Sequence, residues 1–320
     1  MLNADRLRIL AELSRRGTLR AVAESLSYST SAVSQQLHQL EKDVGVPLVA
    51  RAGRRLVLTD QGTVLAAHAR TILADMERAE ADVLAAGTEP RGTVTVAGFQ
   101  SAAVTLVPAA LSDLHTRHPG VDVVFRLGET DEALAALPGA GVDVDVVLAE
   151  SYPGAVVPPA PGVVLVPLLR DPLRLAVGAE RAASLDQEGD VLAQLADAAW
   201  AAEPEHTPPR AWLGEQCRRR GYEPRVTYVS EDLAVQAAFV AGGHAVAVLP
   251  ELALDSAPEG IVTLPLGNPP PCRTVTAAWR ESARNHRAAQ AVLEALRRAA
   301  DAVAGPGAAP VRTPRTVPER

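Results

Sequence analysis

Four side chains that both donate and accept hydrogen bonds lie at helical spacing in one stretch of the chain: Ser31, Ser34, Gln35 and His38. They share one face of an expected helix, and an apolar stripe occupies the other face: Val33, Leu37, Leu40 and Val44. A merely solvated face would be expected to carry Glu, Lys and Arg. Uncharged donors and acceptors instead suit the base edges of a DNA major groove, where a glutamine can make two hydrogen bonds to adenine. The sequence therefore predicts a helix that reads DNA.

Phosphate contacts are predicted on both sides of this helix. The turn before it contains Tyr28, Ser29 and Thr30, and either Ser29 or Thr30 is expected to cap the helix. After the helix, two short apolar segments flank a turn at Gly53 and predict a β-hairpin. Arginines gather at its tip: Arg51, Arg54 and Arg55. We interpret the hairpin as a wing that touches phosphates, with an ordinary solvated hairpin tip as the alternative.

Two earlier helices are expected to position the reading helix. The first covers residues 5–16 and ends at Gly17, with a buried line of Leu7, Leu10 and Leu13. Thr18 can cap a short second helix over residues 19–26, and a turn then leads into the reading helix. Residues 1–59 thus read as a winged helix-turn-helix.

A long helix is predicted over residues 60–86, capped by Thr59. Its apolar positions follow a heptad seam: Leu65, Ala69, Ile72, Met76, Ala79 and Val83. No partner helix is obvious in the same chain, so the seam predicts a homodimer through a second copy of this helix. The alternative is packing against the body of its own chain.

The remainder, residues 87–303, alternates strands and helices in two similar series, which predicts parallel sheet with helices on its faces. The chain is therefore expected to be an α/β multidomain protein whose second half has two lobes and a cleft. Ligands of such sheets bind beyond the carboxyl ends of the strands. That rule directs attention to four segments that follow strands: 99–101, 128–130, 203–204 and 229–231.

Charge is distributed unevenly along the chain. The net charge is −7, but residues 1–62 hold nine Lys or Arg against six Asp or Glu, and the remainder holds 22 against 32. A basic end on an acidic body fits a DNA-binding module attached to another function. No signal peptide or membrane-spanning stretch is recognisable, so we expect a cytoplasmic protein with no membrane partner. The Pro-rich tail, residues 304–320, is predicted to be disordered.

The run from Gly17 to Gly62 resembles the LysR-type transcriptional regulators. It contains the pattern SAVSQQLxxLExxxGVPL, followed by an arginine and LT-x-x-G at fixed distances. Residues 92–123 and 231–254 resemble the effector domain of the same family, so the likeness covers residues 1 to about 303. One departure is Val49, where the family usually has Phe.

This resemblance implies a winged helix-turn-helix that binds a dyad-symmetric operator in double-stranded DNA. It also implies a dimer through the linker helix, often paired into a homotetramer, and a periplasmic-binding-protein-like effector domain. Lobe I would comprise residues 92–165 and 268–303, and lobe II residues 166–267. Operator binding would be modulated by a small molecule held in the cleft, with these contacts implied by the family: Gln100, Ser101, Thr130, Glu203 and Ser230.

The chemistry of that small molecule stays open at this point. Gln100 and Ser101 at a helix N-terminus favour an anion or carboxylate. Glu203, if it faces the cleft, disfavours an anion and suits an amine. Helix capping alone is the alternative role of Ser101, Thr130 and Ser230.

Other classes of protein fit the residues less well. No GxxxxGK or GxSxG motif occurs, so no enzyme, cofactor or metal is expected. His115 and His118 lack a further ligand nearby, and Asp143 and Asp145 fit a strand entering the cleft better than a catalytic pair. Cys217 as a redox-sensing thiol remains an alternative. A transport-type solute-binding protein would not need residues 1–86.

Overall fold

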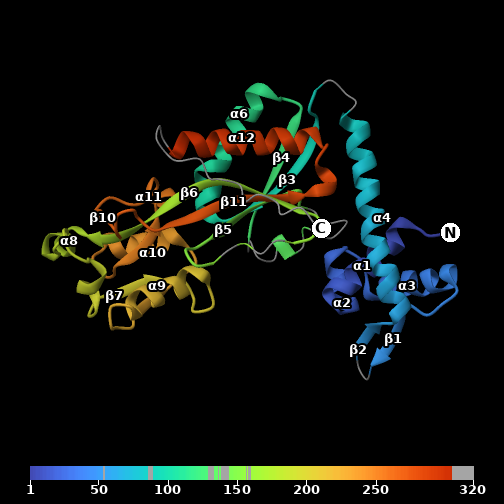
Figure 1. Cartoon of the computed structure of the whole chain (residues 1–320), viewed down its shortest axis with the longest axis horizontal. Helices are drawn as coiled ribbons and strands as arrows, with labels where there is room; N and C mark the ends of the chain where they lie inside the picture. Colours follow the sequence, from blue (N-terminus) through green and yellow to red (C-terminus); the bar gives the residue numbers. More distant parts are fainter. Residues whose placement is uncertain are drawn as a thin grey trace, which may run out of the picture.

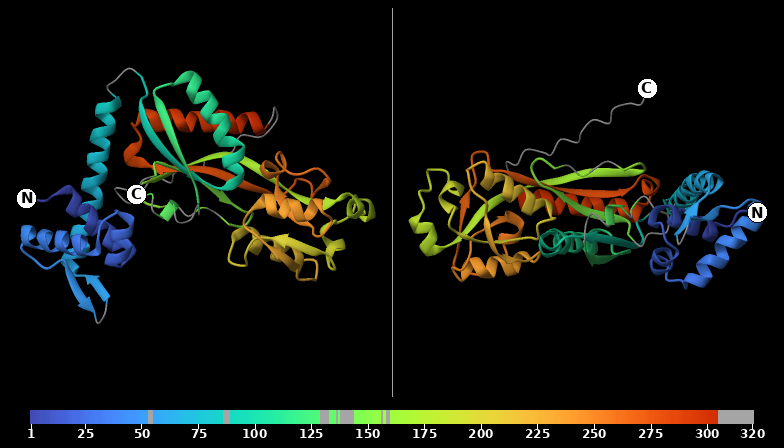
Figure 2. Two further views of the ribbon diagram at one scale, coloured as in Figure 1. Left: turned by 180° about the vertical axis from the view of Figure 1, so that it is seen from behind. Right: turned by 90° about the horizontal axis from the view of Figure 1, so that it is seen from below.

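The computed structural model describes residues 1–52, 55–85, 89–128, 133–135, 137, 144–155, 157 and 160–304. It has an N-terminal helical module and an elongated α/β body, joined by one long helix (Figure 1). The views from behind and from below show the module at one end of the body (Figure 2). Asp143 and the tail from residue 305 lie outside the described residues.

The N-terminal module has the predicted helix-turn-helix and hairpin. Its elements are α1 (Ala4–Arg16), α2 (Leu19–Ser25), α3 (Thr30–Val44), β1 (Val49–Ala52) and β2 (Arg55–Leu58). Each of the three helices is capped by a side-chain oxygen that accepts a backbone N–H of its first turn. The capping residues are Asn3 for α1, Thr18 for α2 and Ser29 for α3. Ser29, rather than Thr30, is the cap of α3. Gly17 and Gly45 end α1 and α3 with φ of 73° and 83°, a conformation that other residues adopt at a cost.

The core of the module confirms most of the apolar stripe on α3. Val33, Leu37 and Leu40 are at most 3% exposed and pack with α1. Val44 is 37% exposed, so its predicted burial is wrong. It is the last residue of α3, and the chain turns at Gly45 before the core can cover it.

The long helix α4 (Asp60–Ala85) starts at Thr59, whose hydroxyl accepts the Gly62 N–H at 3.0 Å. A Cβ on Gly62 would lie 1.9 Å from the Leu48 carbonyl oxygen, so only glycine fits where α4 crosses the start of the wing. The first half of α4 has a partner in its own chain, because Ala69 and Leu73 are buried against α1. Further along, Met76 and Val83 are 44% and 74% exposed.

The body begins with a sheet covered by two long helices. Its strands are β3 (Gly92–Gly98), β4 (Val121–Leu127), β5 (Val146–Ser151), β11 (Cys272–Arg280) and the first half of β6 (Val163–Gly178). The covering helices are α6 (Leu106–Arg117) and α12 (Arg287–Ala304), which lie side by side in Figure 1. Arg298 of α12 donates from Nε to Asp113 of α6 at 3.0 Å and ties the two helices together. The short α5 (Gln100–Val104) follows β3, and the one-turn η2 (Glu281–Ala283) follows β11.

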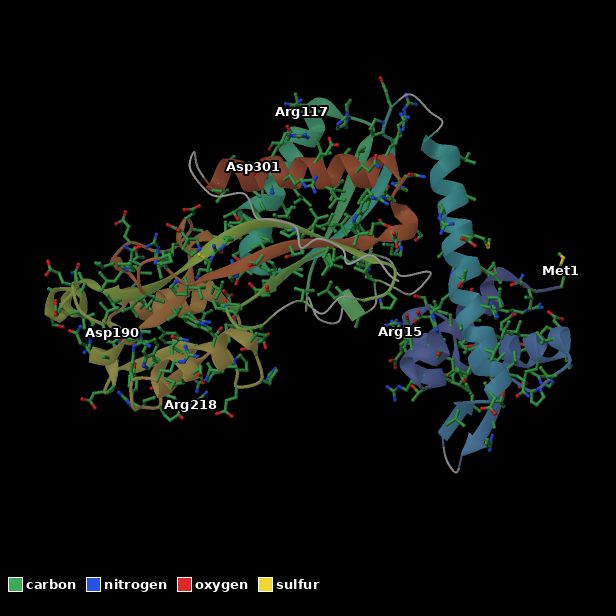
Figure 3. The ribbon with its side chains drawn as sticks, in the orientation of Figure 1. Met1, Arg15, Arg117, Asp190, Arg218 and Asp301 are labelled. Atoms are coloured by element: carbon green, nitrogen blue, oxygen red, sulfur yellow. The ribbon has the colours of Figure 1, made fainter. Side chains whose placement is uncertain are left out.

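The second lobe is built on the other half of β6. Its strands and helices are β7 (Ala199–Ala202), β8 (Arg225–Val229), β9 (Ala247–Pro250), β10 (Ile261–Pro265), α8 (Ala179–Ser184), η1 (Leu192–Leu195), α9 (Pro208–Arg218), α10 (Leu233–Ala241) and α11 (Glu251–Leu254). Asp190 and Arg218 lie towards the end of the body that is farthest from the N-terminal module (Figure 3). None of the described helices is long and apolar enough to cross a membrane.

Strands β6 and β11 connect the two lobes. β6 pairs with β11 as far as Pro172 and with β9 and β10 from Leu173 onward, so by strand pairing the sheet changes there. The expected parallel pairing holds for β3 with β4, β3 with β5, and β7 with β8. β11 instead runs antiparallel to β5 and β6, because it returns from the second lobe to the first. The sheet is therefore mixed.

Candidate DNA-binding face and interlobe cleft

The base-reading candidates on α3 are all exposed: Ser31, Ser34, Gln35 and His38. The side chains of Ser34 and Gln35 make no hydrogen bond to any described residue of the chain. Two neighbouring glutamines differ from Gln35 in this respect. Gln36 accepts the Arg6 Nε–H at 3.0 Å, and Gln39 donates to Asp43 at 3.0 Å. The helix thus separates side chains that hold the module together from side chains that are available to a partner.

The turn before α3 presents Tyr28 at 49% exposure, followed by exposed Ser29 and Thr30. The Ser29 hydroxyl accepts the Ala32 N–H at 3.1 Å and lies 2.9 Å from the Ser31 hydroxyl. Ser29 therefore has a structural task at the helix start, in the place where an N-terminus can also meet a phosphate.

The wing is held against α3 by Glu41. Its carboxylate accepts the backbone N–H groups of Leu48 and Val49 at 2.9 and 3.2 Å, where β1 begins. Arg51 is exposed on β1. Arg55 opens β2 opposite Ala52, and Arg54 lies outside the described residues. The structural role of Glu41 was not predicted, although its fixed distance from the wing in the LExxxGVPL pattern is a signal for it.

A cavity of about 420 Å³ lies between the lobes. It is lined by Phe99, Gln100, Leu127, Gly128, Glu150, Glu203, Thr207, Pro208, Pro209, Glu231 and Asp232. Among the predicted effector contacts, Gln100 and Glu203 line it. Thr130 lies outside the described residues. The Ser230 hydroxyl accepts the Asp232 N–H at 3.1 Å, which is the capping role considered as its alternative.

Gln100 bridges the two lobes. Its Nε2 donates to Asp232 at 2.7 Å, and its Oε1 accepts the Leu233 N–H at 2.9 Å. Asp232 also caps α10 by accepting the Ala234 N–H at 2.8 Å. The hydrogen bond from Gln100 lowers the pKa of Asp232, with the α10 backbone adding to the effect. Gln100 therefore joins α5 to α10 across one side of the cleft.

Ser101 does not line this cavity, and its side chain lies next to a buried arginine. It is 3% exposed, and its hydroxyl accepts the Arg273 Nη2–H at 2.6 Å. Arg273 is 1% exposed on β11, and its guanidinium lies 5.0 Å from the centre of the Phe99 ring.

Two carboxylates neutralise Arg273. Asp171 on β6 accepts its Nε–H at 2.8 Å and is itself 1% exposed, and Glu150 at the end of β5 accepts from Nη1. Burial acts to lower the pKa of Arg273, but Glu150, Tyr152 and Asp171 together outweigh it and the pKa rises above the usual range. Burial raises the pKa of Asp171, against the pull of Arg273. Sequence reasoning missed this group, for which the one signal is a charged residue within the otherwise uncharged run CRTVTAAW.

Glu203 lines the cavity from the second lobe, and its pKa is shifted towards neutral pH. Burial, reinforced by the charge of Glu150, raises its pKa to about 7. Glu203 therefore changes charge near neutral pH.

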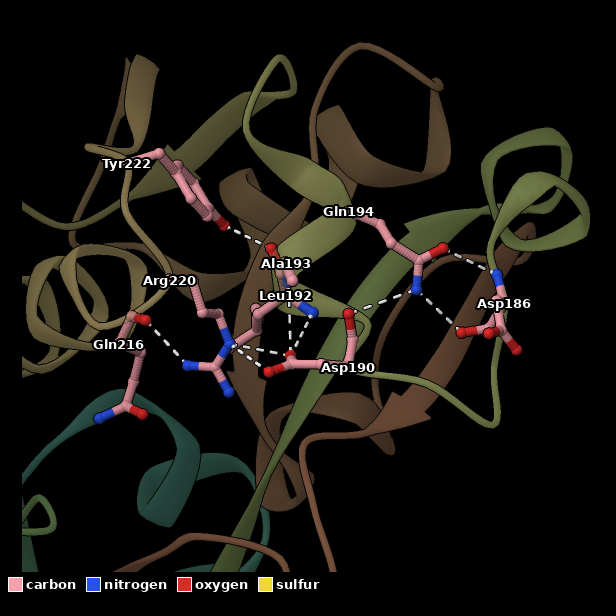
Figure 4. Close-up of polar contacts among 8 residues, drawn as sticks. All are labelled: Asp186, Asp190, Leu192, Ala193, Gln194, Gln216, Arg220 and Tyr222. Carbon is pink, nitrogen blue, oxygen red and sulfur yellow. Dashed lines mark hydrogen bonds and ion pairs between the residues drawn. The ribbon is translucent and has the colours of Figure 1, made fainter.

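Neither cysteine has the surroundings of a reactive thiol. Cys217 on α9 is 0% exposed, Cys272 is half-buried, and both are free. Burial raises the pKa of each thiol, which opposes formation of the nucleophilic thiolate. Close to Cys217, Arg220 donates to Asp190 at 2.8 Å and Tyr222 donates to the Leu192 carbonyl at 2.7 Å (Figure 4). These bonds tie η1 to the segment after α9 and keep the thiol enclosed.

Comparisons with known proteins agree with both regions. The family model described as "Bacterial regulatory helix-turn-helix protein, lysR family" matches residues 4–63, and the "LysR substrate binding domain" matches residues 87–301. The hydrogen peroxide-inducible genes activator of Dickeya chrysanthemi is 25% identical over 288 residues, which cover 87% of this chain and 90% of the relative.

Solved structures share the fold. A full-length OxyR variant from Pseudomonas aeruginosa aligns with a TM-score of 0.67 at 23% identity, covering 93% of this chain and 95% of that one. Full-length CbnR, solved in complex with its target DNA, aligns with a TM-score of 0.53 at 24% identity, covering 94% of this chain and 100% of that one.

Proposed function

The chain belongs to the LysR family of bacterial DNA-binding transcriptional regulators, and on that premise we propose that two copies of α3 read a dyad-symmetric operator. A small molecule in the interlobe cleft would modulate this binding. The observation that carries the proposal is the contrast on α3 between Gln35, exposed and without a partner in the described chain, and Gln36, held by Arg6. Polar side chains left without partners at the surface of a rigid helix are suited to base edges.

Base contacts are assigned to the exposed face of α3: Ser31, Ser34, Gln35 and His38. Phosphate contacts are assigned to the preceding turn and the wing: Tyr28, Ser29, Thr30, Arg51, Arg54 and Arg55. Support comes from the attachment of the wing to α3 through Glu41, which keeps the two sets of contacts in register. CbnR is a protein of the same fold that has been solved on its target DNA.

A second copy of the chain is proposed to cover the exposed half of α4. Met76 and Val83 are seven residues apart and so lie on one face of the helix, with 44% and 74% of their surface exposed. Pairing of these helices would bury that face and set two α3 helices at a fixed spacing. Assembly of such dimers into a tetramer is part of the same proposal.

Response to peroxide, the property named for the Dickeya relative, is not proposed for this chain. Such a response requires an accessible thiol of lowered pKa. Both cysteines here have raised pKa values, and Cys217 is fully enclosed. No enzymatic activity is proposed either, because the relatives are transcriptional regulators. Binding to a chromosomal operator would require the protein to act in the cytoplasm.

The test is fluorescence anisotropy with duplexes that tile the DNA upstream of the protein's own gene. One duplex should bind at least about a thousandfold more tightly than a scrambled duplex of equal composition. Footprinting of that duplex should show two related half-sites about one helical turn or more apart. Equal affinity for all duplexes at physiological salt would contradict the proposal.

A further inference from the structure

The interlobe cavity is acidic on both sides. Glu150 lines it from the first lobe, and Glu203, Glu231 and Asp232 line it from the second. Its lining among the described residues includes no Lys, Arg or His. We propose that the effector of this regulator is a small organic cation, an amine or guanidine on a short aliphatic skeleton. This inference rests on the proposed function, since the family and the interlobe position identify the cavity as the effector site, and the carboxylates decide only the charge of its ligand.

The buried Arg273 does not cancel the acidity of the cavity. Its guanidinium is already matched by Asp171 and Glu150 and also donates to Ser101. Arg273 contributes one positive charge to this cluster, and Asp171 and Glu150 contribute two carboxylates. An anionic ligand would have to displace Asp171, Glu150 or Ser101 to reach the arginine, and displacing either carboxylate would leave it without its counter-charge.

Two of the four lining carboxylates are free to meet a ligand. Asp232 is occupied by Gln100 and by the N-terminus of α10, and Glu150 is occupied by Arg273. Glu203 and Glu231 form no ion pair with any described residue. A positive group within about 4–6 Å of Glu203 would stabilise its charged form, which burial now disfavours. A second negative charge there would be repelled.

The apolar part of the lining sets the rest of the ligand. Phe99, Leu127, Pro208 and Pro209 supply hydrocarbon surface beside the carboxylates. A cavity of about 420 Å³ is near the lower end of the usual range for small-molecule sites. A short aliphatic skeleton can contact these walls while its cationic end reaches Glu203.

The feature that favoured an anion does not supply a site here. α5 is only five residues long, and the Ser101 hydroxyl at its start is taken by Arg273. The Gln100 amide at the same helix start is taken by the second lobe. Ser101 is 3% exposed and does not line the cavity, and Gln100 is already held by the second lobe, so these two side chains do not form an anion site in the cavity.

The experiment is isothermal titration calorimetry on the full chain at pH 8 and low salt. The probes are 1,4-diaminobutane and agmatine, with succinate and 1,4-butanediol as four-carbon controls of negative and zero charge. The proposal expects saturable binding of at least one of the two cations and no binding of either control. Binding of succinate in place of the cations, or binding of no probe, would overturn it. Operator binding measured on the same preparation separates the two claims, because its loss would contradict the proposed function instead.

Substitutions locate the binding. Glu203→Gln should lower the affinity for the cation by about tenfold to a hundredfold, since a charge-assisted contact becomes a neutral one. Glu205→Gln is the matched control: Glu205 is exposed, carries the same charge two residues away and does not line the cavity. If both variants weaken binding equally, the site is not this cavity. Glu231→Gln, at an exposed position, gives a second reading if Glu203→Gln fails to fold.

The pH dependence gives an independent check. Cation affinity should rise between pH 6 and pH 8 as Glu203 loses its proton, and Glu203→Gln should remove that rise. The charged or titratable groups around Glu203 are Glu150, Glu231, Asp232, Arg273, Tyr152 and Arg210. Tyr152 stays neutral across this window because burial raises its pKa well above the usual value. Affinity that is flat in the wild type would contradict a role for Glu203.

Discussion

The two binding regions of this chain are assembled on different scales. The DNA contacts proposed for α3 and its preceding turn all lie within residues 28–38, and the periodicity of one helix positions most of them. The cleft gathers residues from Phe99 to Arg273, carried by both lobes and by the strands that connect them. The side chains of Ser34 and Gln35 on α3 are exposed and unpaired within the described chain, whereas in the cleft Gln100 is paired with Asp232 and Glu150 with Arg273. The DNA-binding face can therefore be changed one residue at a time, but the cleft responds as a network.

The largest effect is expected from Arg273→Met. Removal of the guanidinium leaves the buried Asp171 and the partly buried Glu150 with no counter-charge, which should cost about 3–5 kcal/mol. Hydrogen exchange should show faster opening of β6 and β11 and unchanged protection of α1 and α3. The exposed Arg181→Met is the control. Equal protection of β6 and β11 in both variants would mean that the network adds little stability.

Gln35→Ala tests whether contacts on the DNA-binding face act one at a time. Loss of a bidentate contact to a base should weaken operator binding by about 1–3 kcal/mol and relax the preference at one base pair. Gln36→Ala is the control from the same helix, because Gln36 is bound to Arg6. Anisotropy titrations of both variants give the comparison, and an equal loss in the two would exclude a specific role for Gln35.

Arg51→Ala should have a smaller and less selective effect. If Arg51 neutralises one phosphate, its removal weakens binding to all sequences alike and reduces the slope of log K against log salt by about 0.9. Arg20, exposed on α2 and paired with Glu24, provides the control Arg20→Ala. A loss confined to the operator sequence would instead indicate that Arg51 contacts a base.

The smallest effect concerns stability and Glu203. Its pKa is about 7 in the folded chain against 4.5 for an ordinary glutamate, so the folded state holds the extra proton between those values. Stability in the wild type is therefore expected to fall as the pH rises from about 4.5 to about 7. Glu203→Gln should be more stable than the wild type at pH 8, by at most about 1 kcal/mol after solvent screening, and should lose that advantage near pH 5. Thermal melts at the two pH values check the sign.

The N-terminal module was predicted almost residue by residue. Its signals are local: the caps at Thr18 and Ser29, the glycines that end α1 and α3, and the 3.6-residue spacing of Val33, Leu37 and Leu40. The expectation that Val44 belongs to the buried stripe was wrong, because burial at the end of a helix depends on the path of the next segment. The seam of α4 was expected to face a second copy along its whole length, but its first half packs on α1 of the same chain. A heptad pattern specifies an apolar seam but does not specify what covers it.

The cleft was only partly predictable. The positions of Gln100 and Glu203 follow from strands that end at the cavity. The isolated charge of Arg273 is visible in the sequence, but nothing near it indicates that Glu150 and Asp171, on other strands, would surround it.

The sequence by itself determined which helix presents the candidate DNA-binding face, since helical period and capping act within a few residues. The tertiary structure alone decided which cleft residues are occupied by one another and which remain for a ligand. The reason is physical: pairing of Arg273 with Asp171 and Glu150, and of Gln100 with Asp232, depends on β5, β6, β11 and α10 meeting in space. The carboxylates of Glu203 and Glu231 remain in the cavity because these contacts occupy the other charged groups.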